Sequence, residues 1–229
     1  MAATEKSSRS GTGGLRSTLN RRLPYWGPQL VVLCAILLDL VLPKRVAVGP
    51  VWLLPAVEGV LLAGLVIASP QGNVRHSPRR RKVAIGLTAF VSTTNMISLV
   101  LLCVRLVNGN VHQGGALIGA GVALWVTNVL LFGIWYWELD RGGPVARERH
   151  EHDVPDFLFP QMTEPRWAPE DWEPGLIDYL YVSFTNGTAF SPTDTMPLTP
   201  MAKSLMSAQA LAALVTIGLV VARAVNILG

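Results

Sequence analysis

Long apolar runs alternate with short polar stretches along most of the chain. Five runs are long and apolar enough to cross a bilayer with a hydrocarbon core of about 30 Å. A sixth run, Leu176–Ala189, is too short to span and is interrupted by Asp178 and Asn186, which predicts a re-entrant or interfacial helix. Because the alternation of barrel strands is missing, all the runs are predicted to be helices. The predicted spans are Gly27–Leu42, Val51–Ala68, Val83–Val107, Gly115–Leu139 and Met201–Leu228.

The composition strengthens the prediction of an all-α integral membrane protein. Of 229 residues, 50% are hydrophobic and only 15% are charged, and the mean hydropathy is +0.39. These values are too apolar for an average soluble domain, so the lipid bilayer is the expected partner. The net charge of +4 is modest, and its basic residues lie beside apolar runs, which argues against nucleic acid as a partner. Cys34 and Cys103 lie within apolar runs and are predicted to be small buried thiols rather than a disulfide.

Clusters of basic residues predict the topology. The N-terminal tail and the loop after the second predicted span carry these clusters, so both are expected on the cytoplasmic side. With five spans, the N-terminus is then cytoplasmic and Gly229 lies on the opposite side of the membrane. The clustered residues are Lys6, Arg9, Arg16, Arg21 and Arg22 in the tail and Arg75, Arg79, Arg80, Arg81 and Lys82 in the loop.

The pattern divides the chain into four parts. Residues 1–26 form a flexible, basic cytoplasmic tail, and residues 27–139 form a four-helix transmembrane bundle. Residues 140–175 are an acidic linker rich in proline and tryptophan, and residues 176–229 hold the short helix, a polar loop and the last span. The aromatic residues of the linker predict a strap that lies on the membrane surface or across the helix ends.

Three polar residues lie near the middle of successive predicted spans: Glu58, Asn95 and Asn128. They can meet if they face the interior of the bundle. Two interpretations remain open, interhelical hydrogen bonding that holds the helices together and a proton relay through Glu58. Both require Glu58 to be shielded near Asn95 or Asn128, because an unpaired carboxylate in hydrocarbon is costly.

Other motifs indicate packing or solvated turns rather than chemistry. A ridge of small residues in the fourth span is predicted to pack against a neighbouring helix: Gly115, Gly119 and Ala123. His150, His152 and Asp153 are interpreted as a solvated charged turn, since further metal ligands are missing. The chain has neither a nucleophile elbow nor a glycine-rich phosphate loop. We therefore expect no enzyme activity, no cofactor and no metal.

The C-terminal part resembles the pore module of potassium channels. In that module a short helix leads to T-T-V-G-Y-G-D, followed by a proline three residues after the acid and a threonine two residues further. The stretch "TAFSPTDTMPLT" keeps this frame, with Thr188, Asp194, Pro197 and Thr199 at the matching positions. The resemblance covers about 50 residues and implies a pore-like re-entrant helix, a tetramer and a monovalent cation as the permeant species.

The filter positions depart from the channel motif. Ala189 and Phe190 stand in place of threonine and valine, and Ser191, Pro192 and Thr193 replace glycine, tyrosine and glycine. A potassium filter needs backbone geometry that glycine permits and that proline and β-branched threonine do not favour. The loop therefore predicts a hydroxyl-lined constriction of low selectivity rather than a potassium-selective filter.

Over its whole length the chain also resembles uncharacterised bacterial membrane proteins with five spans, which share "YWELDRGGP" and the "SFTxxTAFSPTD" pattern. This resemblance implies the inner membrane of a bacterium and a shared fold. Three functions stay open: a channel-like oligomer, a non-conducting scaffold or partner-binding protein, and proton-coupled transport through Glu58. In the scaffold alternative, Asp194 or Thr199 caps the last helix.

Overall fold

The computed structural model describes residues 27–38, 56–57, 59–60, 62–63, 78–107, 114–149, 154–164, 166, 168, 172–188 and 194–228. These residues are mostly helical, which confirms the predicted helical class. Some predictions concern residues outside this part of the chain: Glu58, His150, His152, Asp153 and residues 189–193.

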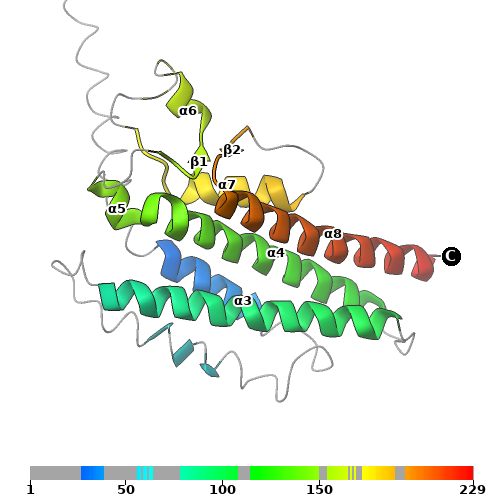
Figure 1. Cartoon of the computed structure of the whole chain (residues 1–229). Coiled ribbons are helices and arrows are strands. Elements are labelled where there is room, and N and C mark those ends of the chain that lie inside the picture. The colour runs from blue at the N-terminus through cyan, green and yellow to red at the C-terminus, as the bar shows by residue number, and fades with distance from the viewer. Residues whose placement is uncertain are drawn as a thin grey trace, which may run out of the picture.

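Three long helices form the body of the molecule: α3 (Pro78–Val107), α4 (Gly114–Leu139) and α8 (Pro200–Leu228). Figure 1 shows them side by side, and α4 contacts α3, α8 and the shorter helix α7 (Leu176–Gly187). By length and composition, three segments can cross a membrane: Arg81–Val104, Ile118–Gly142 and Pro200–Ala222. A shorter apolar helix, Gly27–Leu38, packs near α3 and α4.

Short elements gather where α4 ends. The 3₁₀ turn η1 (Asp140–Gly142) and helix α5 (Pro144–Glu148) follow α4, and helix α6 (Pro160–Thr163) comes after strand β1 (Phe157–Leu158). Strand β1 pairs antiparallel with β2 (Met196–Pro197), with Phe157 opposite Pro197. This pairing joins the segment after α4 to the segment before α8 (Figure 1).

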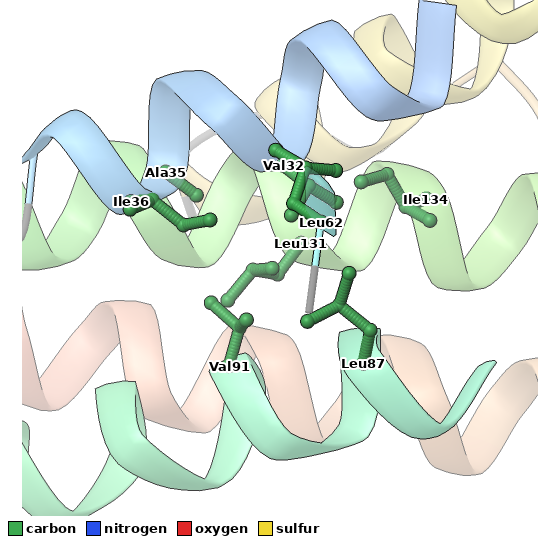
Figure 2. Packing of buried hydrophobic residues seen from close by; sticks show 8 residues of the cluster. All are labelled: Val32, Ala35, Ile36, Leu62, Leu87, Val91, Leu131 and Ile134. Atoms are coloured by element: carbon green, nitrogen blue, oxygen red, sulfur yellow. The ribbon is translucent and has the colours of Figure 1, made fainter. Parts of the chain in front are cut away.

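Buried apolar side chains form three clusters along the bundle. The first joins helix Gly27–Leu38, α3 and α4 through residues that include Val32, Val91 and Leu131 (Figure 2). The second joins α3, α4 and α8 and includes Leu99 and Leu124. The third is aromatic, and its buried members are Tyr136, Trp137, Phe157, Phe159, Tyr179, Val182 and Ala202.

The aromatic cluster explains how the segment after α4 is held. Phe157 and Phe159 are buried against Tyr179, and Trp172 meets Phe159 edge to face at a centroid distance of 6.0 Å. The described residues 154–164 and Trp172 therefore lie across the ends of α4, α7 and α8, as the aromatic composition predicts.

The outer surface of the bundle is apolar, and its apolar interior also contains polar side chains. Exposed side chains on α8 include Leu211, Leu214, Val221 and Val225, and those on α3 include Ile97, Val100 and Val104. Buried positions in the long helices hold Thr88, Thr94, Asn95, Ser98, Thr127, Asn128, Gln209 and Thr216. In water this distribution would be unfavourable, but in lipid the apolar surface faces hydrocarbon and the polar groups meet one another. The protein thus has the surface of a membrane protein.

The helix limits agree well with the sequence in the second half of the chain. Helices α4 and α8 match the predicted spans within one residue, and α7 matches the predicted short helix. Helix α3 begins five residues earlier than predicted, at Pro78, because the basic run continues as helix. Of the first two predicted spans, the structure describes Gly27–Leu38 and a few helical residues between 56 and 63.

The predicted packing ridge on α4 is wrong at two of its three positions. Gly115 and Gly119 are exposed, and a β-carbon at either would meet nothing within 4 Å. Close approach occurs elsewhere on the same helix. A β-carbon on Gly121 would clash with Val220 Cγ2, and one on Gly133 would lie 3.1 Å from the Leu180 α-carbon. These two glycines let α8 and α7 approach α4.

Candidate functional site

The chain turns sharply where it leaves α4. Arg141 has a φ angle of +50°, and Gly142 and Gly143 follow at +75° and +97°. Glycine adopts such angles at little cost, whereas other residues rarely do. This turn directs the backbone of residues 154–158 back over the end of α4, where the side chain of Asp140 is fully buried.

Asp140 accepts hydrogen bonds from two later segments of the chain. Its Oδ1 accepts from the backbone N–H groups of Asp156 at 2.8 Å and Phe157 at 3.3 Å. Its Oδ2 accepts from the Tyr179 hydroxyl at 2.5 Å and lies 3.7 Å from Arg141 Nε. A buried carboxylate is tolerated only with partners of this kind. We call Asp140, Asp156, Tyr179 and Thr199 the Asp140 clamp.

Asp156 extends the Asp140 clamp to the start of α8. Its Oδ2 accepts from the Arg141 backbone N–H at 2.8 Å, and its Oδ1 accepts from the Thr199 hydroxyl at 2.6 Å. Thr199 Oγ1 in turn accepts from the Ala202 backbone N–H at 3.3 Å. Thr199 is therefore the N-cap of α8, with Pro200 at the first helical position, where proline is well tolerated.

Two arginines complete this end of the bundle. Arg147 is buried, and its Nη1 donates to the carbonyl oxygens of Trp137 and Asp140 at 2.7 and 2.8 Å. Its guanidinium lies 5.2 Å from the centroid of the Tyr179 ring. Arg81, near the start of α3, donates to the Glu138 carbonyl oxygen at 3.0 Å. We call the end of the bundle where Arg81, Arg141 and Arg147 lie the basic end.

Burial has a clear effect on the titration of two groups on α7. It raises the pKa of the Tyr179 phenol well above its ordinary value, and Arg147 offsets part of this effect while Asp140 adds to it. Tyr179 therefore remains a hydrogen-bond donor throughout the neutral range. Burial also raises the pKa of Asp178, although its carboxylate accepts from the Gly175 backbone N–H at 2.7 Å at the start of α7.

A second set of polar side chains fixes α7 between α4 and α8. Gln209 Oε1 accepts from the Tyr136 hydroxyl at 2.5 Å and from Asn186 Nδ2 at 2.8 Å. Gln209 Nε2 donates to Ser183 Oγ at 2.7 Å, and the Ser183 hydroxyl donates to the Val129 carbonyl oxygen at 2.6 Å. We call Tyr136, Ser183, Asn186 and Gln209 the α7 network. Each of its side chains both orients and satisfies the next, which favours one rigid position of α7.

A third set of buried polar residues consists of Asn95 on α3 and Thr127 and Asn128 on α4. These side chains are 4%, 0% and 5% exposed. The atoms Asn95 Oδ1, Thr127 Oγ1 and Asn128 Oδ1 have no hydrogen-bond partner among the described residues. We call these three residues the polar layer. The predicted proximity of Glu58 to Asn95 or Asn128 stays a prediction.

The predicted pore residues fall into separate environments. Thr188 ends α7, and its hydroxyl donates to the Thr185 carbonyl oxygen at 2.8 Å. Asp194 is exposed, Pro197 belongs to β2, and Thr199 belongs to the Asp140 clamp. Ala189, Phe190, Ser191, Pro192 and Thr193, which complete the predicted filter, lie outside the described residues.

The Asp140 clamp and the α7 network contain residues that sequence reasoning did not single out as site residues. Tyr179, Ser183 and Asn186 are spaced by four and three residues and so share one face of α7. Gln209 is an isolated amide in a long apolar run. Both patterns are signals of a buried polar contact in a membrane helix bundle.

The described residues do not contain a group of three or more His, Cys, Asp or Glu side chains placed to hold a metal ion. Cys34 and Cys103 are free thiols, as predicted, but the predicted burial is wrong, because Cys34 is exposed and Cys103 is only half-buried. The contacts of the Asp140 clamp and of the α7 network fix the relative positions of α4, α7 and α8. Comparisons of the chain with protein-family models, curated proteins and solved structures give no match.

Proposed function

We propose that the protein is a channel-like oligomer in the bacterial inner membrane. In this proposal α7, the polar loop after it and α8 from each copy surround a cation pathway of low selectivity. Four copies and a monovalent cation follow from the resemblance of "TAFSPTD" to the channel motif.

The observation that carries the proposal is the path of the chain around α7. Tyr179, in the first turn of α7, contacts Asp140 at the basic end. Gly187, the last residue of α7, lies beside Trp125 on α4, and Trp125 Nε1 donates to the Gly187 carbonyl oxygen at 2.9 Å. Nine residues after Gly187, β2 is again at the basic end, paired with β1. In a pore loop, a short helix enters the membrane part of the way, and the chain then returns to the same side before the next spanning helix begins. Helices α7 and α8 follow this arrangement.

The dimensions of α7 support a re-entrant role. Its 12 residues extend about 18 Å, well short of a hydrocarbon core of about 30 Å. Its inner face carries the polar contacts, and its outer face exposes Ile177, Tyr181 and Phe184. These apolar residues suit contact with lipid or with another copy of the chain.

The proposed orientation follows from the basic end. Arginines beside the ends of apolar helices favour the cytoplasmic side, so α7 enters from the cytoplasm. If helix Gly27–Leu38 and the helical residues 56–57, 59–60 and 62–63 belong to two further spans, the N-terminus is cytoplasmic and Gly229 faces outward. This orientation is opposite to that of the potassium-channel pore loop.

The test combines oligomeric mass in nanodiscs with cation flux in liposomes. We expect a tetramer that conducts monovalent cations. Because Asp194 is exposed and would stand at the mouth of the pathway, Asp194→Asn should lower the flux roughly two- to tenfold at low salt. Glu173→Gln removes another exposed carboxylate, and it should leave the flux unchanged. A strict monomer, or a wild type that conducts in no salt, would end the channel proposal.

One observation favours the second candidate, a non-conducting scaffold. Thr199 and Pro197, which match the channel frame, take part in helix capping and strand pairing. In a scaffold, the role of the "SPTDTMPLTP" stretch is to make these contacts, which connect α7 to α8. Absence of flux together with a folded, stable oligomer or monomer would favour this alternative.

A further inference from the structure

The polar layer lies on facing sides of α3 and α4. Asn95 is four residues from both Val91 and Leu99, so the three share one face of α3. Val91 packs in the cluster that contains Leu131, and Leu99 packs in the cluster that contains Leu124. Figure 2 shows Val91 and Leu131 directed toward each other from α3 and α4.

Thr127 occupies the matching position on α4. It lies three residues after Leu124 and four before Leu131, and Asn128 is its neighbour on the same side. The polar layer is therefore enclosed between two apolar clusters, near the middle of both candidate spans. Two amide groups and one hydroxyl are thus nearly fully buried at similar positions along the facing helices.

The hydroxyl of Thr127 differs from those of other threonines in these helices. Thr88, Thr93 and Thr216 each donate to the carbonyl oxygen four residues earlier, at 2.7 to 3.0 Å. This bond within the helix is the usual way to satisfy a threonine hydroxyl away from water. Thr127 Oγ1 makes no such bond in the described structure, although its side chain is fully buried. Its hydroxyl therefore remains free for a group that is not part of the described chain.

We propose that the polar layer is a binding site for a small electropositive guest that takes oxygen ligands. The unpaired atoms are the amide oxygens of Asn95 and Asn128 and the hydroxyl oxygen of Thr127. A water molecule that donates its hydrogens, or a desolvated monovalent cation, satisfies such a set of oxygens. The site lies inside a single subunit, so it is separate from the cation pathway proposed between subunits.

Isosteric substitution tests the proposal through thermal unfolding in detergent. Thr127→Val removes the hydroxyl at nearly constant volume, and it should lower the melting temperature by about 2–4 °C because a bound partner is lost. Thr216→Val is the matched control, since that buried hydroxyl already bonds its own helix, and it should shift the melting temperature by less than about 1 °C. Thr127→Ser keeps the hydroxyl but loses a buried methyl group, so its melting temperature can fall while the guest-dependent signals described below are retained. An unchanged or raised melting temperature for Thr127→Val would overturn the proposal.

Two further measurements identify the guest. A cation raises the melting temperature in sodium or potassium chloride relative to choline chloride at equal ionic strength, and Thr127→Val abolishes this rise. Water gives no such ion dependence, but it allows hydroxyl-radical labelling of the buried side chains Leu124 and Leu131, and Thr127→Val reduces this labelling. Absence of both the ion dependence and the labelling in the wild type would overturn the proposal even if Thr127→Val is destabilising.

Discussion

Asp140 connects the end of α4 to two later segments of the chain. It is fully buried, and its two oxygens connect the end of α4 to the backbone before β1 and to the first turn of α7. Removing one member of a buried charged set is costly because the remaining donors lose their partner in a region without water. The stability of this end should thus depend strongly on one carboxylate.

We expect Asp140→Asn to lower the free energy of unfolding by about 3–5 kcal/mol. Asparagine keeps the shape but has only one oxygen, so either the Tyr179 hydroxyl or the N–H of Asp156 faces an amide NH₂ group. Unfolding in detergent with increasing denaturant measures the difference. The exposed Asp194→Asn is the control and should change stability by less than about 0.5 kcal/mol. Equal effects of the two substitutions would contradict the role assigned to Asp140.

The turn after α4 depends on glycine at position 143. Its φ angle is +97°, and a β-carbon there would lie 2.8 Å from the Glu138 carbonyl oxygen and 2.9 Å from Arg81 Nη2. Gly143→Ala should therefore cost at least about 1–3 kcal/mol, from backbone strain and from the clash together. Gly119→Ala, at an exposed helical site with open space around it, should be neutral or slightly stabilising in the same unfolding assay. Similar melting temperatures for the two variants would refute the strain argument.

Helix α7 is much shorter than the neighbouring helices α4 and α8, between which it is fixed. It is short, yet one side of it is fixed by the α7 network and by the close approach of Leu180 to Gly133. This fixation sets where the polar loop begins, so the proposed pathway depends on the position of one helix. The outer face of α7 is apolar and forms part of the apolar surface that suits contact with lipid.

Gly133→Ala should displace α7 from α4. A β-carbon at this position would lie 2.6 Å from Leu180 Cδ2 and 3.1 Å from the Leu180 α-carbon, and the backbone contact cannot be relieved by a side-chain rotation. We expect a loss of about 1–3 kcal/mol, the usual cost of overpacking. Gly218→Ala, which has open space on α8, should be nearly neutral. Limited proteolysis should also cut Gly133→Ala faster than Gly218→Ala, and equal rates would argue against displacement.

The helices themselves could be predicted, but most of their contacts could not. The apolar runs predict the starts of α4 and α8 within one residue and the start of α7 at Leu176, whereas α7 ends at Gly187, two residues before the predicted Ala189. The Asp140 clamp could not be predicted from the apolar runs, because an acidic residue at the end of a predicted span is usually expected to be exposed to water. Its partners are 16 and 39 residues away, and nothing local in the sequence specifies that separation.

The glycines of α4 show the same limit. A small-xxx-small pattern marks where a helix can approach another, but it does not say which face meets a neighbour. Gly115 and Gly119 have the pattern without the contact, whereas Gly121 and Gly133 have the contact without the pattern. The candidate pore residues Thr188, Asp194 and Thr199 follow from a sequence motif. Of the two predicted cap residues, Asp194 and Thr199, it is Thr199 that caps α8.

The described part of the molecule has many apolar side chains on its outer surface and buries several polar ones, and Arg81, Arg141 and Arg147 lie at one end. This arrangement predicts one orientation in the bilayer. The N-terminus and the C-terminus should lie on opposite sides of the membrane, with the N-terminus in the cytoplasm. Alkaline phosphatase and fluorescent-protein fusions at each end measure this directly. Reporters active on the same side would reject five spans and would reverse the side from which α7 enters.

The Asp140 clamp also sets an order of events during synthesis. Asp140 leaves the ribosome 39 residues before Tyr179, and Asp156 leaves 43 residues before Thr199. At about 5–20 residues per second, the first interval alone lasts about 2–8 s. During that time α4 can insert while its terminal carboxylate is still hydrated among the lipid headgroups. Asp140 can leave water only when Tyr179 and the backbone of Asp156 have arrived, so the final closure of this end has to follow the emergence of α7, and α8 receives its cap last.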